Sequence, residues 1–392
     1  MSWELYFSLS AMMFLQFTVW GAWGPVLSAH LLGPLRMNAK QTAWIYATLP
    51  LACILSPLVA GQIVDRWMPT EWFLAGAHLV GAVCLLVAAK RSTFRGMFVT
   101  MGIYSLLYAP TLALVNSLAF HHLPHPDTDY FWVRVWGSVA WVLVGWLLAG
   151  WRRWGRWQVK GSDALMMAAV FSLVMGLFSL SLPHTPPRGA PDTVLPALKA
   201  LGMLKHVDFA IFLVISFVVG TQLQFYFVGT SRFLEDIGVA PKNIPAAMTL
   251  AQVVQAISMG AIVPFILPQI GYGKTLALGI LAWAFMYFAY ALTRPRWLVV
   301  VSMMLHGFAF ACFFDTAFIY VNRVSPPDIR GSAQSLYFVV YGLGLFAGTQ
   351  FAGAIMDWLR REGRFRWRTI FAIPCVLLTL CALGCLAVFK GN

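Results

Sequence analysis

The sequence predicts an all-α integral membrane protein with twelve transmembrane helices in two six-helix bundles. The first observation is composition: of 392 residues, 60% are hydrophobic and 10% are charged, whereas a water-soluble surface carries about 25–35% charged residues. The second is a succession of apolar runs along the whole chain, each of about 20 residues and so able to cross about 30 Å of hydrocarbon as a helix. The third is one long polar interruption, which divides the runs six and six.

The predicted spans follow from these apolar runs. In chain order they are residues 5–32, 41–64, 72–90, 96–120, 130–151, 162–182, 207–233, 243–268, 273–292, 297–322, 331–357 and 367–389. The first run is too long and too aromatic for a cleavable signal peptide, and no A-x-A-like cleavage site follows it. We therefore expect it to be a retained helix.

A stretch rich in proline and polar residues, residues 183–206, is the expected linker between an N-terminal bundle, residues 1–182, and a C-terminal bundle, residues 207–392. Two six-helix halves joined in this way are typical of transporters that hold substrate between the halves near the bilayer midplane. A channel or a membrane enzyme could share the helix count. An enzyme should show clustered His, Asp or Glu ligands or a nucleophile with its base, and a sensor should add a soluble domain. The sequence shows neither, so we expect no enzyme.

The basic residues, which give a net charge of +13, lie in the loops between the spans. They indicate contacts with lipid headgroups and a role in topology, and we expect no nucleic-acid partner. Seventeen Lys and Arg lie in the loops on one side and eight on the side of the termini, so the positive-inside rule alone places both termini outside. The six cysteines lie inside apolar segments without metal-ligand spacing. We interpret them as core residues, and we expect no metal and no cofactor.

Asp315, in FACFFDTAFIY, is the only carboxylate well inside a predicted span. Ionisable groups within the membrane are costly, so each is a functional candidate. Two interpretations of Asp315 remain open. It is either a carboxylate near a helix end that reaches headgroups or pairs with a neighbouring helix, or a protonatable group in a cavity.

Arg134 lies in FWVRVWGSVAW, about four residues into its span, so snorkelling to the interface is one interpretation. The other depends on spacing. Arg134, Ser138 and Trp141 are at i, i+4 and i+7 and share a helix face. A cation, a hydroxyl and an indole suit a polar ligand with a flat ring, because the guanidinium donates to its oxygens and the indole stacks on it.

Other polar and aromatic side chains within the spans fit a cavity of this kind: Gln222, Gln224, Gln252, Gln255, His306 and Phe310. Each amide offers donors and acceptors, as recognition of a heterocycle edge or a sugar hydroxyl requires. Gln252 and Gln255 share a face at i and i+3. Taken singly, each of these residues could instead bond between helices or pack in the core.

Several motifs together resemble the nucleoside:proton symporter family of the major facilitator superfamily. They are FLQFTVWGAWGP (14–25), AGQIVDRW (60–67), YAPTLALVNSLAF (108–120), VRVWGSVAW (133–141), HGFAFACFFDTAFIYVNRVSPPDIRGSAQSL (306–336) and GAIMDW (353–358). The resemblance runs from the first span to the last. The LQF-x-x-WG-x-W opening and the R-x-WG-S segment are more specific than GQIVDR, which is a weak superfamily signature.

The resemblance implies a carrier in the bacterial cytoplasmic (inner) membrane that moves nucleosides inward with protons by alternating access. It also implies cytoplasmic termini, against the charge count, and we follow the resemblance because it extends along the whole chain. Asp65, Arg66 and Arg330 lie in its loop motifs and are expected to act in gating. We expect a monomer whose partners are the nucleoside, the proton and membrane lipid.

By matching motif, the resemblance assigns substrate contacts to a set of residues: Arg134, Ser138, Trp141, Gln224, Gln252, His306 and Phe310. Ser138 replaces a threonine and Trp141 a phenylalanine. Phe227, which we include in the candidate site with Gln255, stands where an asparagine is expected.

Two departures concern the family's acids. Gln255 stands where the eighth helix has a glutamate, and Ala311 stands where an acid follows the tenth-helix aromatic. Asp315 lies four residues beyond Ala311 on the same helix face and could restore an acid at a shifted depth. Proton coupling through Asp315 is therefore a hypothesis. A nucleoside uniporter, or a carrier of sugars or small aromatic acids, remains open.

Overall fold

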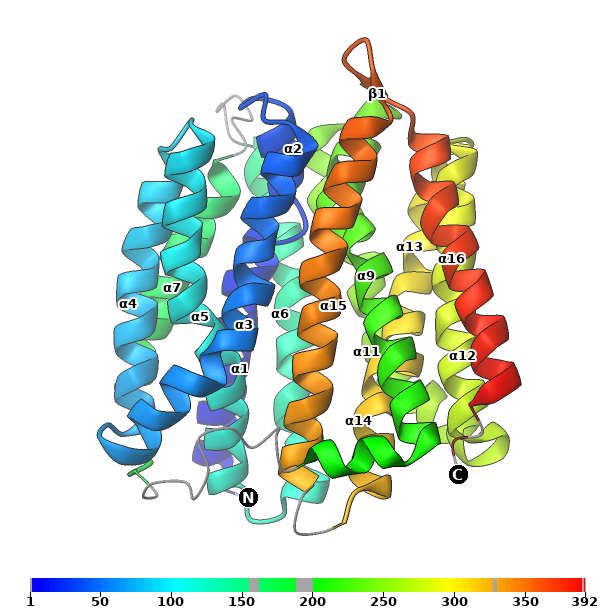
Figure 1. The fold of residues 1–392 in the computed structure, drawn as a ribbon. Helices are drawn as coiled ribbons and strands as arrows, with labels where there is room; N and C mark the ends of the chain where they lie inside the picture. Colours follow the sequence, from blue (N-terminus) through cyan, green and yellow to red (C-terminus); the bar gives the residue numbers. More distant parts are fainter. Residues whose placement is uncertain (1, 155–161, 188–199, 327–329, 390, 392) are drawn as a thin grey trace. The chain divides into compact units, whose positions relative to one another are not determined.

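The structure is a computed structural model that describes residues 2–154, 162–187, 200–326, 330–389 and 391 (Figure 1). Side chains at 56–66, 126–128, 131, 330–332 and 335 lie outside the description. The chain forms two compact units. Unit 1 comprises residues 1–37, 51–194 and 240–246, and unit 2 comprises residues 38–50, 195–239 and 247–392.

The helices of unit 1 are α1 (Trp3–Trp23), α2 (Leu27–Leu32), α4 (Thr70–Ala89), α5 (Phe94–His122), α6 (Pro126–Trp154), α7 (Asp163–Ser179) and η2 (Pro241–Asn243). Helix α3 (Ala39–Arg66) belongs to unit 2 as far as Pro50 and to unit 1 from Leu51. Helix α10 (Ile244–Met248) also begins in unit 1 and ends in unit 2.

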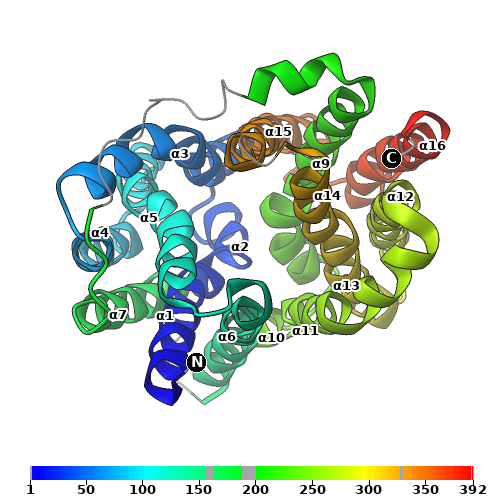
Figure 2. The same cartoon turned by 90° about the horizontal axis from the view of Figure 1, so that it is seen from below.

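Within unit 1, α1 packs against α6 and α7, and α4 packs against α5 and α7 (Figure 2). The first predicted span is interrupted, because α1 ends at Trp23 and α2 begins at Leu27. Pro25 lies in the intervening turn, where it lacks the N–H that a continuous helix would need. A Cβ at Gly24 would lie 2.9 Å from the Trp20 ring, so glycine at this position leaves room for the indole.

The elements of unit 2 include eleven helical segments and a short hairpin in the described part of the chain. After the first part of α3 they are η1 (Ala200–Lys205), α9 (Val207–Asp236), α11 (Leu250–Ile257), η3 (Ser258–Ile262), α12 (Val263–Leu292), α13 (Arg296–Phe310), η4 (Ala311–Asp315), α14 (Thr316–Val324), α15 (Arg330–Trp358), β1 (Arg360–Arg361), β2 (Arg364–Phe365) and α16 (Trp367–Val388).

Helix α9 packs along α15, and α12 packs along α16 (Figure 1). The first of these contacts depends on glycines. A Cβ on Gly344 would lie 2.6 Å from the carbonyl oxygen of Phe217, and one on Gly348 would overlap the carbonyl oxygen of Thr221. Small residues let helix backbones approach closely in a membrane, where helix association depends on such packing.

Some helical segments of unit 2 are irregular. Segments η3 and η4 are π-helical, and Gly271, at φ 76° and ψ 174°, separates two parts of α12. The kink lies between the predicted spans 243–268 and 273–292. Single π-turns inside α-helices are frequent at functional sites, and here they directly follow the segments that carry Gln255 and Phe310.

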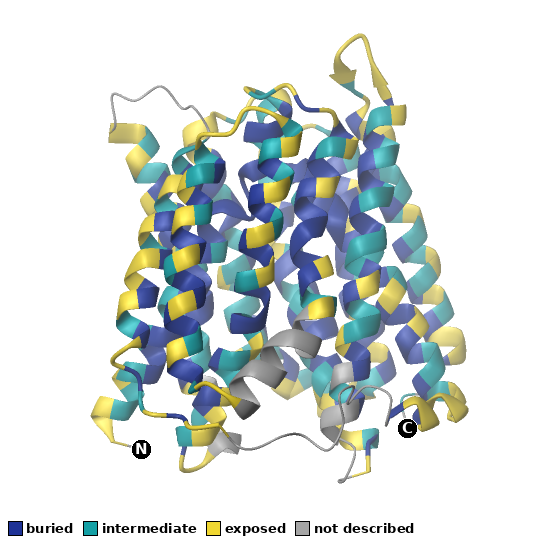
Figure 3. Cartoon of the chain, turned by 60° about the vertical axis from the view of Figure 1, so that its left-hand side comes forward, coloured by how far each residue is buried: buried dark blue, intermediate teal, exposed yellow. Residues whose placement is uncertain are grey.

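Many large apolar side chains of the helices are exposed, and Figure 3 marks exposed positions along the helices. Within the described residues, nine helical stretches are long and apolar enough to cross a membrane. The predicted spans fall on helical segments, and some are divided: 5–32 between α1 and α2, and 243–268 among α10, α11, η3 and the start of α12. The chain is therefore an all-α, multi-pass membrane protein.

Candidate functional site

Arg134 on α6 lies over the ring of Phe17 on α1. Its guanidinium carbon is 4.1 Å from the ring centroid, a distance at which the negative face of the ring attracts the cation. Among the described residues, the guanidinium has no hydrogen-bond acceptor or ion-pair partner. With respect to these residues its N–H groups can donate to a ligand, and the substrate-contact role of Arg134 stays a prediction.

Gly137 makes room for this pair. A Cβ at Gly137 would lie 2.6 Å from Nη1 of Arg134 and 2.8 Å from Cδ2 of Phe17. Both distances are shorter than real Cβ contacts, so any side chain here would displace the guanidinium, the ring or both. Phe17 and Gly137 thus form a slot that holds Arg134, and we call these two residues the Arg134 slot.

Ser138 and Trp141 continue the same face of α6. Ser138 is buried, and the Trp141 ring meets that of Trp20 edge to face at 5.3 Å. A Cβ at Gly21 would lie 3.2 Å from Trp141 Cδ2, so glycine again allows the two helices to approach. The structure therefore brings the three predicted residues of α6 together along α1.

A buried polar network lies on another side of α1. Gln16 Oε1 is 2.8 Å from His78 Nε2, and Gln16 Nε2 donates to Thr111 Oγ1 at 2.7 Å. The hydroxyl of Tyr108 donates to the Gln16 carbonyl at 2.8 Å, and Ser172 Oγ donates to the His78 carbonyl at 2.8 Å. All five residues are buried, so the network ties α1 to α4, α5 and α7.

The network also bears on the Arg134 slot, since Gln16 and Phe17 are neighbours in the chain. Buried polar networks that are fully hydrogen-bonded make a packing arrangement rigid and unique. Fixing the backbone at Gln16 therefore fixes where the Phe17 ring stands, and with it the platform for Arg134.

In unit 2, His306 on α13 lies in an aromatic cluster. Its ring stacks on Tyr226 at 4.0 Å, and Phe227 and Phe310 each lie 6.4 Å from it. Trp283 Nε1 donates to His306 Nδ1 at 3.1 Å. A neutral imidazole that accepts at Nδ1 carries its proton on Nε2. The cluster therefore sets the tautomer of His306 and leaves Nε2–H as a donor.

A tight crossing brings the backbone of α11, which carries Gln252 and Gln255, close to α13 at Gly307. A Cβ on Gly307 would overlap the carbonyl oxygen of Ala251 and lie 2.6 Å from the backbone nitrogen of Gln255. Gln252 and Gln255 are both half-buried on α11. Because His306 is adjacent to Gly307, the crossing fixes its position relative to the α11 backbone.

The four predicted glutamines differ in their hydrogen bonding. Gln222 Nε2 donates to Thr221 Oγ1 at 2.8 Å, and both Gln222 and Gln224 are buried. Within the described part of the chain, the side chains of Gln224, Gln252 and Gln255 form no hydrogen bond. These three amides can therefore still offer both donors and acceptors to a ligand.

Asp315 ends the π-helical segment η4 and is half-buried. Ala311, where the resembled family has an acid, is fully buried. It packs in an apolar cluster composed of Val263, Cys312, Met259, Ile266, Leu267 and Phe308. The position of the missing acid is thus filled by hydrocarbon, and Asp315 lies one turn beyond it.

The predicted gating residues lie at helix ends. Asp65 and Arg66 end α3, and Arg330 begins α15. Their side chains are outside the described residues, so their role stays a prediction.

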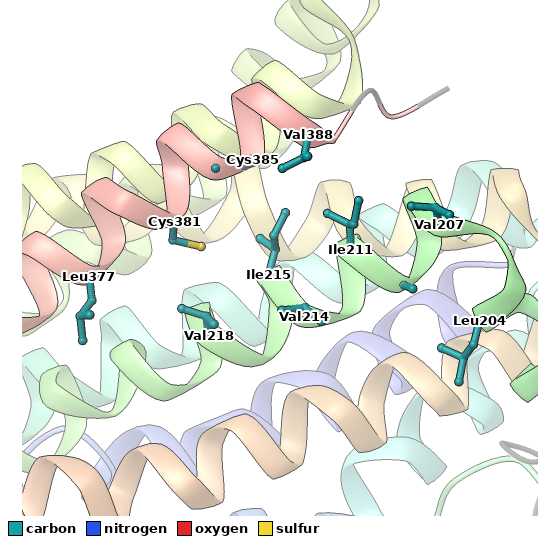
Figure 4. Close-up of a pocket in the computed structure, with 12 residues that line it drawn as sticks. Leu204, Val207, Ile211, Val214, Ile215, Val218, Leu377, Cys381, Cys385 and Val388 are labelled. Carbon is teal, nitrogen blue, oxygen red and sulfur yellow. The ribbon is translucent and has the colours of Figure 1, made fainter.

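A groove of about 540 Å³ lies between α9 and α16 of unit 2 (Figure 4). It is lined by aliphatic residues with two cysteines, among them Val207, Ile211, Ile215, Leu377, Cys381 and Cys385. The lining lacks side chains that hydrogen-bond strongly, whereas binding of a polar ligand requires a few well-placed polar groups. This groove therefore does not suit a ligand rich in hydroxyl groups.

The sequence analysis did not identify several residues that surround Arg134 in unit 1 and His306 in unit 2. Phe17 and Gly137 lie inside the motifs that carried the family resemblance, so the motifs themselves could have pointed to them. Tyr226 and Trp283 had no distinguishing signal, because aromatic residues make up 15% of the chain. Nothing in the sequence identified which buried aromatic would contact His306.

Comparisons with known proteins agree with the motifs. YegT of Escherichia coli is 31% identical over 401 residues, which cover 98% of this chain and 93% of YegT. The nucleoside permease NupG of Escherichia coli is 27% identical, with 99% and 96% covered. A crystal structure of a NupG mutant matches with a TM-score of 0.89 at 27% identity, covering 98% of this chain and all of that one. The family model described as nucleoside H+ symporter matches residues 3–392, and the chain belongs to that family.

Proposed function

We propose that the protein is a secondary active transporter that moves nucleosides across the cytoplasmic membrane by alternating access, with proton symport. The observation that carries the proposal is the Arg134 slot, in which a guanidinium with free donors stands beside Ser138 and Trp141. A nucleoside presents ribose hydroxyls, base oxygens and a flat ring. Charge-assisted donors suit the oxygens and an indole suits the ring.

Unit 2 supplies a second set of groups with complementary chemistry. His306 donates through Nε2, the free amides of Gln224, Gln252 and Gln255 both donate and accept, and Phe310 adds an aromatic face. Amides of this kind read the edge of a heterocycle, where donors and acceptors alternate. We infer that these residues and the α6 residues Arg134, Ser138 and Trp141 all take part in nucleoside binding. Phe227 adds an aromatic ring where the family resemblance predicts an asparagine.

The test is uptake of labelled uridine, adenosine and a galactoside by proteoliposomes that contain the purified protein. We expect uptake of one or both nucleosides and none of the galactoside. An Arg134→Ala variant that inserts normally should lose nucleoside binding. Uptake of the galactoside alone would refute the proposal and favour a sugar carrier.

We infer that Asp315 is the proton-coupling group. It lies one turn beyond buried Ala311, at the end of the π-helical segment that directly follows Phe310. A change in its protonation can therefore alter the helix between Phe310 and α14. In proteoliposomes, an inward proton gradient should accelerate uridine uptake by the native protein. Asp315→Asn should remove this acceleration while leaving uridine exchange at equal pH. Equal gradient dependence in both proteins would exclude Asp315 from coupling.

The arrangement in the membrane completes the proposal. We infer twelve spans in two bundles joined by residues 183–206, a monomer with cytoplasmic termini, and gating roles for Asp65, Arg66 and Arg330. A reporter fused after the last residue should give a cytoplasmic signal. A periplasmic signal would show that the charge count, and not the family resemblance, gives the correct topology.

A further inference from the structure

Asp357, in the GAIMDW motif near the end of α15, lies at the first turn of α3. Its Oδ1 accepts a hydrogen bond from the backbone N–H of Ala39 at 2.7 Å, and its Oδ2 accepts one from Lys40 at 2.9 Å. The contact joins residues more than 300 positions apart. A carboxylate with both oxygens on the N–H groups of a helix start combines charge-assisted hydrogen bonds with the positive end of the helix dipole.

The first turn of α3 obtains its remaining acceptors locally. Asn38 Oδ1 accepts from the N–H of Gln41 at 2.7 Å, the Asn38 carbonyl accepts from Thr42 at 3.0 Å, and Gln41 Oε1 accepts from the N–H of Asn38 at 3.1 Å. The opening N–H groups of a helix have no partner within the helix. Asn38 thus accepts hydrogen bonds from the N–H groups of Gln41 and Thr42. The N–H groups of Ala39 and Lys40 are instead bonded to the carboxylate of Asp357.

The contact between α3 and α15 continues beyond Asp357. A Cβ on Gly353 would lie 2.9 Å from the Ala39 carbonyl oxygen and would overlap the Cβ of Ala43. One to two turns further, Trp44 meets Phe346 edge to face at 6.0 Å. The first part of α3 therefore lies along the last three turns of α15, with glycine at the closest approach.

Helix α3 changes unit at Pro50. Residues 38–50 belong to unit 2 with α15, whereas Leu51 and the rest of α3 belong to unit 1. Proline has no N–H, so the helical bond from position 50 to the carbonyl of Tyr46 is missing, and prolines are common points of helix bending. Any movement of unit 1 relative to unit 2 must therefore bend α3 near Pro50 or detach its first part from α15.

We propose that Asp357 is a conformational latch of the transport cycle. Its carboxylate holds the first turn of α3 on α15 in one state, and the cycle requires its release in the other. Asp357 acts through the α3 backbone, so it is a positioning residue that sets the balance between the two states. The proposal rests on the proposed transport function but does not depend on which substrate is carried.

The test measures access to a buried position of α3 with a membrane-impermeant maleimide. Ala47, 1% exposed, lies one turn after Ala43 on the face that meets α15, and Ala47→Cys is introduced after the six native cysteines are replaced. Asp357→Ala should raise the labelling rate roughly fivefold or more, the usual range of conformational coupling. Asp357→Glu keeps the carboxylate and should restore slow labelling, and Asp357→Asn should be intermediate.

A second position distinguishes latch release from unfolding. Ala168 on α7 of unit 1 is fully buried, and Ala168→Cys should stay unlabelled in every Asp357 variant. Unchanged labelling of Ala47→Cys in Asp357→Ala would overturn the proposal, as would equal acceleration at both positions. Because labelling needs no substrate, failure here is distinguishable from a failure to transport nucleosides.

Discussion

Gly137→Ala is the most direct test of the Arg134 slot. The added Cβ would lie 2.6 Å from Arg134 Nη1 and 2.8 Å from Phe17 Cδ2, whereas ordinary contacts begin at 3.4 Å. The guanidinium must therefore move by a substantial fraction of an ångström, out of its position over the ring. We expect nucleoside binding to weaken without loss of helix stability, since alanine favours a helix over glycine by about 1 kcal/mol.

The size of the effect follows from the contact that is disturbed. A cation over an aromatic ring contributes about 0.5–1 kcal/mol at exposed sites and about 2 kcal/mol when desolvated, and Arg134 is half-buried. If the displacement of Arg134 lowers the binding free energy of uridine by about 1 kcal/mol, the uridine Kd rises roughly fivefold. The Kd is measured by equilibrium binding of labelled uridine to the purified protein in detergent.

Gly102→Ala on α5 is the matched control. A Cβ at Gly102 meets nothing within 4 Å, so this variant makes the same chemical change in a helix of the same unit without displacing a neighbour. Its Kd should equal that of the native protein. If Gly137→Ala and Gly102→Ala bind uridine equally well, the reasoning that Arg134 contacts substrate from this slot is refuted.

Three further outcomes are expected. Trp283→Phe removes the donor to Nδ1 of His306, so the imidazole tautomer is no longer set; the uridine Kd should rise severalfold, and an unchanged Kd would exclude His306 Nε2 as a substrate donor. Gln16→Leu leaves a buried His78 nitrogen without its partner, at a cost of about 1–3 kcal/mol, so the midpoint of thermal unfolding should fall measurably. Gly307→Ala forces overlap with the α11 backbone, and the protein should accumulate poorly in the membrane; normal levels would contradict the close crossing.

The helices could be predicted well from the sequence because the bilayer restricts what a spanning segment can be. Every span must be an apolar run that satisfies its own backbone hydrogen bonds, so the runs are visible without any alignment. Local breaks were harder to place. The turn at Gly24 and Pro25 and the kink at Gly271 depend on backbone angles, and a glycine or proline in a transmembrane run is also compatible with an unbroken helix.

The candidate site was predicted only in part, for a physical reason. Arg134 and Asp315 are conspicuous because charge is rare within the spans. Their surroundings are made by residues such as Phe17 and Tyr226, which look like ordinary core residues in an apolar run. The role of His78 in the buried polar network was not recognised for a related reason. The sequence shows that a polar residue is present but not which residue bonds to it, and Gln16 lies 62 positions away.

The apolar cluster around Ala311 limits how this protein can change. An aspartate at that position would enter fully buried hydrocarbon surroundings, and a charge in the centre of a membrane helix costs about 2.5–3.5 kcal/mol. We therefore expect an acid at position 311 to be tolerated only together with changes in its neighbours, such as Val263 and Phe308. The apolar packing around Ala311 thus opposes an acidic side chain at this position as long as these neighbours are unchanged.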